Sequence, residues 1–252
     1  MTAPRTTTLR TARERARAEV TQAIKEEACR QLAAEGASKL SLRAVARELG
    51  MVSSALYRYF PGRDDLLTAL IVDAYNALGD AVEQALAAGH DRDPVERWTA
   101  VCHAARDWAV AHPHEYALIY GTPVPGYAAP DDTSGPGVRL PLALVAVATA
   151  AQRAGRLGPP EGEPAPPEVL ADIAPVIPEH APELSEASVA ALIGAWAQLL
   201  GLLSFEIFGQ FGDVLPARRA FFAHTVTRLA RSVGLRPAPS AGADGGAASP
   251  AG

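Results

Sequence analysis

Two short helical segments between residues 41 and 60 carry the residues whose spacing has the most direct chemical meaning. Ala46 and Gly50 lie four positions apart, and Leu56 lies six positions beyond Gly50. A small residue at Ala46 lets the second segment approach the first, Gly50 permits the positive φ of a tight turn, and Leu56 fills the angle between the segments. This is the spacing of a helix-turn-helix, whose second helix enters the major groove of duplex DNA.

The distribution of charge favours the same chemistry. The 252-residue chain has a formal net charge of −5, but residues 1–63 hold 12 Arg and Lys against 6 Glu, and the rest of the chain is acidic. A basic N-terminal unit on an acidic body is typical of a protein that binds a polyanion. A basic N-terminal segment without any such partner is the alternative that charge alone leaves open.

The elements that must position these residues are helical. Apolar residues recur with helical periodicity and sustained period-2 alternation is absent, so the sequence predicts an all-α fold. Residues 158–182 contain 8 prolines and are predicted to form a long loop. Six residues of the helix-turn-helix are assigned to its core: Leu42, Val45, Leu49, Met51, Leu56 and Phe60. The predicted helices span residues 13–35, 42–49, 53–60, 63–88, 95–112, 114–120, 141–157, 185–211 and 216–234.

The segment SLRAVARELGMVSSALYRYFPGRDDLL resembles the N-terminal motif of the TetR family of transcriptional regulators, over about residues 20–70. A second segment, HPHEYALIYGTPVPGY, resembles the C-terminal domain of one actinobacterial branch of that family. The resemblance implies a helix-turn-helix DNA-binding domain at residues 13–63 and a helical ligand-binding and dimerisation domain at 64–236. Residues 1–12, a basic arm, and residues 237–252 are expected to be disordered.

The resemblance also implies roles for individual residues. Those expected to face base edges are Val52, Ser53 and Ala55, whose short side chains predict sparse direct readout. Those expected to contact phosphates are Tyr57, Tyr59, which stands where the family usually has His, and Arg63, which stands where Lys is usual. Arg43 lies where the family often has a DNA contact. An arm that reaches the DNA backbone or minor groove is expected from Arg10, Arg13, Arg15 and Arg17. The alternative is that the tyrosines are half-buried aromatics and the arginines only solvate a face.

The segment 185–211 is apolar on nearly all sides and contains small residues that permit close helix approach. With 216–234 it is expected to form a four-helix interface with the same pair of a second subunit, as the resemblance implies. A central core helix of a monomer is the alternative. Because Gly194, Gln198 and Gly201 interrupt its apolar run, the segment is interpreted as too short and mixed to span a membrane.

The aromatic residues of the body are candidates for an apolar effector pocket. They are Trp98, Trp108, Tyr116, Tyr120, Tyr127 and Trp196. Ordinary core packing is the alternative for each of them. His112, His114 and Glu115 span a proline without a supporting cysteine cluster, so we expect no metal. We also expect no cofactor.

The sequence therefore predicts a homodimeric regulator, most simply a repressor that a small molecule releases from a palindromic operator. No nucleophile elbow, P-loop or metalloprotease motif is present, so no catalytic residue is expected. Two cysteines and the absence of an apolar leader predict a reducing cytoplasm. The alternatives are a helical carrier or enzyme with an incidental basic N-terminus, and an architectural DNA-binding protein without a ligand.

Overall fold

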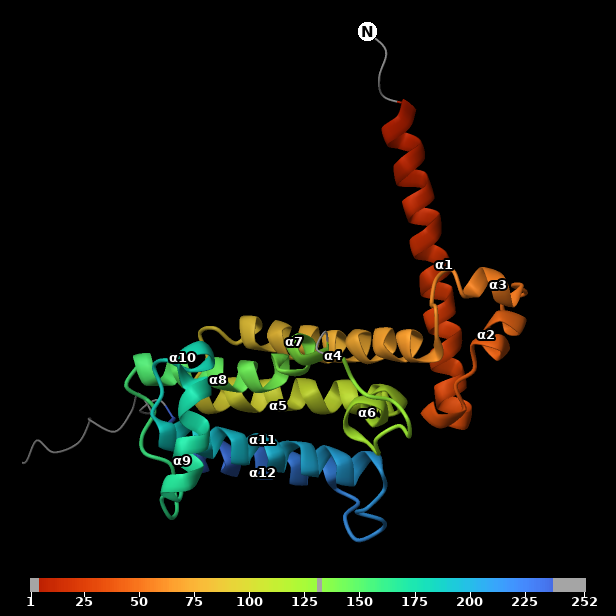
Figure 1. Ribbon diagram of the computed structural model, residues 1–252. Coiled ribbons are helices and arrows are strands. Elements are labelled where there is room, and N and C mark those ends of the chain that lie inside the picture. Colours follow the sequence, from red (N-terminus) through yellow and green to blue (C-terminus); the bar gives the residue numbers. More distant parts are fainter. Residues whose placement is uncertain (1–4, 131–132, 238–252) are drawn as a thin grey trace, which may run out of the picture. The chain divides into compact units, whose positions relative to one another are not determined.

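The chain folds into helices joined by turns and loops (Figure 1). The computed structural model describes residues 5–130 and 133–237, and it contains no strand within those ranges, which confirms the predicted all-α fold. Short 3-10 segments follow α1 and α9. In chain order the α-helices are α1 (Arg5–Glu35), α2 (Leu42–Glu48), α3 (Ser53–Leu56), α4 (Arg63–Ala88), α5 (Pro94–Ala111), α6 (Pro113–Tyr120), α7 (Ser134–Gly137), α8 (Arg139–Arg153), α9 (Pro167–Ile173), α10 (Ile177–His180), α11 (Glu186–Ile207) and α12 (Arg218–Ser232).

The chain divides into two compact units whose boundaries differ from the predicted domain boundary at residue 63. Unit 1 comprises residues 1–80 and 107–139, and unit 2 comprises 81–106 and 140–252. The first half of α4 belongs to unit 1 because its apolar face completes the core of the helix-turn-helix. The core side chains that α4 supplies are Leu66, Leu67, Leu70 and Ile71.

The helix-turn-helix core of unit 1 is built as its sequence predicts. Gly50 has a φ of +64°, which lets the chain turn sharply between α2 and α3. The Ser41 hydroxyl accepts a hydrogen bond from the Ala44 amide at 3.4 Å and caps α2. Of the six predicted core residues, Leu42, Val45, Leu56 and Phe60 are buried, and Leu49 and Met51 are half-buried against them.

Helix α1 is longer than predicted. It begins at Arg5, so residues 5–12 are helical where the sequence predicted disorder. No proline or glycine interrupts residues 5–35, so the helix predicted from residue 13 continues back to Arg5, although four of residues 5–12 are threonines with modest helix propensity. The other residues predicted to be disordered, 1–4 and 238–252, lie outside the described residues.

The proline-rich segment 158–182 is also more regular than predicted, since it contains α9 and α10. Pro167 occupies the first turn of α9, where its missing N–H costs no helical hydrogen bond. Ile173 is buried, and α9 packs against α11. The start of the segment is held by backbone hydrogen bonds, from Gly158 to Gly234 and from Glu161 to Ser232. A loop prediction based on proline count alone missed these anchors.

Candidate nucleic-acid interface

The start of the recognition helix α3 is open to solvent. Val52 is 70% exposed, Ser53 is exposed, and Ala55 is half-buried. Helix α3 ends at Leu56, and a turn over residues 57–59 replaces the rest of the helix that was predicted to reach Phe60. Because Leu56 is fully buried, it fixes α3 to the core while the preceding residues point outward.

A hollow of about 310 Å³ lies beside the turn that follows α3, and three of the predicted DNA contacts line it. Arg43 comes from the first turn of α2, Tyr57 from the turn after α3, and Arg63 from the start of α4. Tyr57 is 42% exposed, so its hydroxyl is accessible from solvent. Ser41 also lines the hollow. Ser41 caps α2, and the same position places this residue at the hollow.

Arg63 has a structural role that its sequence position did not reveal. Its Nη2 donates to the Ala37 carbonyl at 2.8 Å, and its Nε donates to the Leu40 carbonyl at 3.2 Å. These carbonyls belong to the turn between α1 and α2. Arg63 therefore ties that turn to the start of α4, and it also contributes positive charge to the hollow, because its side chain remains 30% exposed.

Tyr59 is held by α1. The Cζ atom of Arg17 lies 5.2 Å from the centre of the Tyr59 ring, and Nη2 of Arg17 donates to the Arg58 carbonyl at 3.3 Å. Sequence reasoning placed Arg17 in an arm that reaches DNA and did not connect it with the turn after α3. A long-range contact of this kind has no local pattern that could have predicted it.

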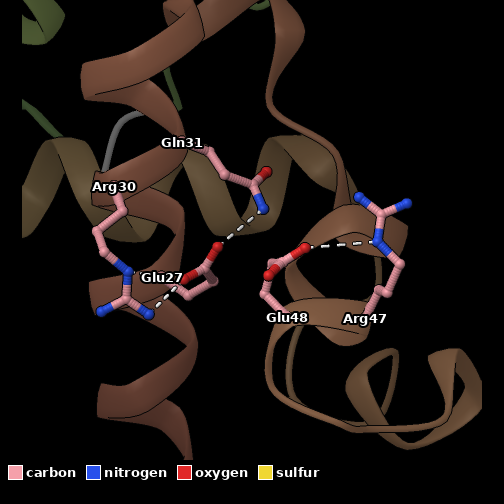
Figure 2. Close-up of polar contacts among 5 residues, drawn as sticks. All are labelled: Glu27, Arg30, Gln31, Arg47 and Glu48. Atoms are coloured by element: carbon pink, nitrogen blue, oxygen red, sulfur yellow. Dashed lines mark hydrogen bonds and ion pairs between the residues drawn. The ribbon is translucent and has the colours of Figure 1, made fainter.

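Figure 2 shows polar contacts on α1 and α2, one set within each helix. Glu27 of α1 is 5% exposed, and it accepts hydrogen bonds from Nε of Arg30 at 2.8 Å and from the amide of Gln31 at 3.2 Å. Arg47 of α2 lies 3.5 Å from the carboxylate of its neighbour Glu48, and both are exposed. Glu27 is thus neutralised locally, so this buried carboxylate does not cancel the positive face formed by Arg43 and Arg63.

The arrangement suits binding of an anionic polymer rather than bond-breaking chemistry. Guanidinium groups and a phenol can bind phosphate oxygens, and exposed short side chains at the start of α3 leave room for base edges. Within the described residues, no group of three or more His, Cys, Asp or Glu side chains is arranged to hold a metal ion.

The aromatic residues predicted to line an effector pocket are divided between the two units. Trp98 and Trp196 lie in unit 2, and the others lie in unit 1. In unit 1, the Tyr116 and Tyr120 rings are 5.3 Å apart, and the Tyr127 hydroxyl lies 2.9 Å from the Thr68 hydroxyl. The sequence missed Tyr75 of α4, whose ring meets Tyr120 edge-on at 5.8 Å. A shared pocket formed by the six predicted residues remains a prediction.

Four of these six aromatics carry a buried polar atom that has no hydrogen-bond partner in the described part of the chain. They are the indole nitrogens of Trp98, Trp108 and Trp196 and the hydroxyl of Tyr120. Burial raises the pKa of Tyr120 above its usual value, with smaller contributions from Tyr75 and Tyr116, so this hydroxyl stays neutral and available as a donor. Leaving such groups unpaired is costly, and each is a donor that a bound acceptor would satisfy.

In unit 2, helices α11 and α12 leave an apolar face uncovered. Its large exposed side chains are Ile193, Phe205, Phe208 and Phe221. A groove of about 340 Å³ crosses this face between Gly201 of α11 and Thr225 of α12. By length and composition α11 is able to cross a membrane, with a mean hydropathy of 1.7 in its most apolar window. The prediction that segment 185–211 is too short and too mixed to span a membrane is therefore wrong on length and composition.

Comparison with known proteins shows which family the chain belongs to. A family model described as bacterial regulatory proteins of the tetR family matches residues 24–70, and a tetracyclin repressor-like C-terminal domain matches residues 98–229. The HTH-type transcriptional regulators Rv1816 of Mycobacterium tuberculosis and Mb1846 of Mycobacterium bovis are each 40% identical over 205 residues, which is 79% of this chain and 86% of theirs. The chain belongs to the TetR family of transcriptional regulators.

Solved structures agree with this assignment. The crystal structure of SCO4313, a protein named as regulatory, is 36% identical with a TM-score of 0.69, and the match covers 86% of this chain and 97% of that one. A protein of unknown function from Rhodococcus sp. RHA1 is 25% identical with a TM-score of 0.61, covering 82% and 93%. TetR-family regulators bind DNA and act as dimers, so DNA and a second copy are the partners of this regulator.

Proposed function

We propose that this TetR-family regulator is a cytoplasmic repressor that binds a palindromic operator as a dimer and leaves it when a small molecule binds. The observation that carries the DNA-binding part is the hollow beside α3, where Arg43, Tyr57 and Arg63 surround one concave surface. A phosphate seated there would place the exposed start of α3 against base edges.

Arg43 and Tyr57 are the phosphate contacts that we propose first. Within the described residues, no hydrogen bond ties either side chain to another part of the protein, so both are available to a ligand. Arg63 adds charge while it holds the turn before α2. Tyr59 remains a candidate through its hydroxyl. Val52, Ser53 and Ala55 are the proposed base-edge positions, and their small side chains predict that the operator is recognised partly through DNA shape.

The dimer that we propose forms through 185–211 and 216–234. A soluble monomer seldom exposes a continuous apolar patch of this kind, whereas an interface between subunits covers it. The Phe211 ring meets the rings of Phe205 and Phe221 edge-on, with centroids 5.6 and 5.8 Å apart. In the proposed dimer these three rings would pack against the same rings of the second copy. Two-fold symmetry would present two recognition helices to two half-sites.

The effector that we propose contains hydrogen-bond acceptors on an apolar framework. This proposal is supported by two buried donors of unit 1 that have no hydrogen-bond partner within the described residues, the indole nitrogen of Trp108 and the hydroxyl of Tyr120. Helix α4 runs from unit 1 into unit 2. A ligand that favours one position of α4 would therefore change the distance between the two helix-turn-helix domains of the dimer. Release requires only that the ligand binds the DNA-incompetent state more tightly.

The test is DNA affinity measured by fluorescence anisotropy on random-sequence and selected duplexes across a series of salt concentrations. A regulator loses affinity with a log–log slope of about −0.9 for each phosphate neutralised. Tyr57→Phe is expected to weaken binding to all sequences alike, whereas substitutions of Ser53 are expected to change sequence preference. A carrier or enzyme with an incidental basic head would show no such binding, and an architectural protein would bind without release by any small molecule.

A further inference from the structure

Residues 12–19 of α1 are exposed, and the Arg17 side chain of this segment contacts the turn that follows the recognition helix. The buried core residues of α1 begin at Ile24, and residues 12–19 are exposed to solvent. In Figure 1 the first half of α1 extends beyond α2 and α3. Arg17 is the residue of this half that contacts the turn after the recognition helix.

The contact has two components that act on the same three-residue turn. Nη2 of Arg17 donates to the Arg58 carbonyl at 3.3 Å, and its guanidinium lies over the Tyr59 ring with Cζ 5.2 Å from the ring centre. Carbonyls that follow the end of a helix have no intrahelical partner, so a charged donor is favourable there. A planar guanidinium is better suited than an ammonium to stack on an aromatic ring and donate at its edge.

The turn held in this way determines where Tyr57 lies. Helix α3 has only four residues, and the turn that follows is held by backbone bonds from Tyr57 to Ser53 and from Tyr59 to Leu56. So short a helix has little stability of its own. Its orientation depends on Leu56 at one point and on the turn at the other.

We propose that Arg17 is a positioning residue for DNA recognition, which holds the turn at residues 57–59 against α1 and thereby fixes the recognition helix and the Tyr57 hydroxyl. This assigns Arg17 a different role from that of an arm that contacts DNA. The proposal rests on the DNA-binding role of the head, and it also predicts behaviour of the protein without DNA.

Salt dependence separates the two roles of Arg17. Loss of an arginine that contacts a phosphate reduces the salt slope by about one contact, whereas loss of a positioning residue lowers affinity at every salt concentration without changing the slope. Arg17→Lys keeps the charge but removes the planar fork. A positioning role therefore predicts that R17K behaves like R17A, and a purely electrostatic role predicts that it behaves like the wild type.

The experiment measures duplex affinity across salt for R17A, R17K, Y59L and the double variant R17A/Y59L. The comparison variant is R15A, which removes the same charge from another exposed residue of the predicted arm, so R15A and R17A lose affinity equally if the arm acts only through its charge. We expect R17A and R17K to lose about three- to tenfold more affinity than R15A at an unchanged slope. The double variant is expected to lose less than the product of the single losses, because both side chains belong to one contact. A reduced slope in R17A, or an R17K that binds like the wild type, would overturn the proposal.

Hydrogen exchange on the DNA-free protein provides the second readout. R17A is expected to accelerate amide exchange at residues 57–60 relative to R15A, while exchange in the core of α1 around Ala28 stays unchanged. Unchanged exchange at residues 57–60 would contradict the proposal even if DNA affinity fell. If the wild type bound no DNA at all, the proposed function would fail, and this exchange measurement would still decide whether Arg17 holds the turn.

Discussion

The exposed face of the helix-turn-helix and the exposed face of α11 and α12 differ in the side chains that they offer to a partner. The first presents Arg43, Tyr57 and Arg63 around a hollow, and the second presents phenylalanines around a groove. Contacts made by charges weaken in salt and tolerate the loss of one member. Contacts made by apolar rings depend on buried area and are little affected by salt. In the proposed function, the protein therefore uses one surface to recognise DNA and a different surface to form the dimer.

The largest expected effect is from a charge on the apolar face. Phe205 is 52% exposed, so Phe205→Arg leaves the fold of the subunit largely intact but places a cation in the proposed interface. We expect a monomer by light scattering and at least a hundredfold loss of operator affinity, because one head alone makes too few contacts.

The matched control for Phe205→Arg is Val110→Arg, which adds the same charge at an apolar side chain of α5 that is 47% exposed. This variant is expected to remain a dimer. If F205R were dimeric and bound DNA like the wild type, the assignment of this face to assembly would be wrong.

The next largest effect is a loss of stability, expected when an ion pair buried behind the apolar face of α11 is broken. Glu206 follows Phe205 in sequence but is paired with Arg106 of α5, with Nε 2.8 Å from Oε2 and both side chains about nine-tenths buried. Glu206→Ala removes the carboxylate that binds the buried Arg106 guanidinium and is expected to cost about 3–5 kcal/mol of unfolding free energy, measured by urea denaturation.

The exposed ion pair between Arg153 and Glu183 provides the control for Glu206→Ala. Glu183→Ala removes a carboxylate from a similar two-point contact, but both partners are exposed, and we expect little change in stability. Equal destabilisation by the two substitutions would show that burial of the Arg106 pair has no energetic consequence.

A smaller effect is expected from the charged face. Arg43→Ala is expected to lower affinity for all duplexes by about tenfold at low salt and to reduce the salt slope by about 0.9. Its control is Arg47→Ala, which removes an arginine of the same helix that already contacts Glu48. The assignment of Arg43 to a phosphate fails if the slope of the variant equals that of the wild type.

The last prediction concerns the reactivity of a side chain inside unit 1 rather than binding or assembly. Burial, with a lesser contribution from Glu115, raises the pKa of Cys29 from 9.0 to about 11. The neutral thiol is therefore favoured in the folded state, and its stabilising contribution holds below pH 9 and is lost as the pH rises towards 11. At pH 8 we expect Cys29 to react with iodoacetamide about a hundredfold more slowly than in urea-unfolded protein.

Assignment of that rate uses Cys29→Ser, since Cys102 is fully buried and its thiol pKa is raised further by burial. Reaction of folded Cys29 at the unfolded rate would show that the thiol is accessible and unperturbed.

The sequence predicted most of the helix-turn-helix domain because the residues that determine its structure lie close together in the chain. Ala46, Gly50 and Leu56 define the turn between α2 and α3 by their spacing, and Ser41 caps the start of α2. The bonds of Arg63 to the carbonyls of Ala37 and Leu40 cross 23 or more residues, so no local pattern reveals them. The same holds for the contact of Arg17 with Tyr59.

The body was harder to predict because its features depend on tertiary packing. Helix α9 forms in a proline-rich stretch because Pro167 begins it and Ile173 anchors it. The six aromatics looked like one set in sequence, whereas they belong to two compact units. Periodicity identifies a helix and its apolar side, but it does not identify the element that covers that side.

The most direct test of the account is selection of bound sequences from a randomised duplex library with the full-length protein, at two salt concentrations. The account predicts enrichment of two inverted half-sites whose centres lie about one helical turn or more apart, with binding that weakens steeply as salt rises. Enrichment of a single half-site would contradict the two-headed dimer, and the absence of any enrichment or salt-dependent binding would contradict the assignment of the α2–α3 surface to DNA.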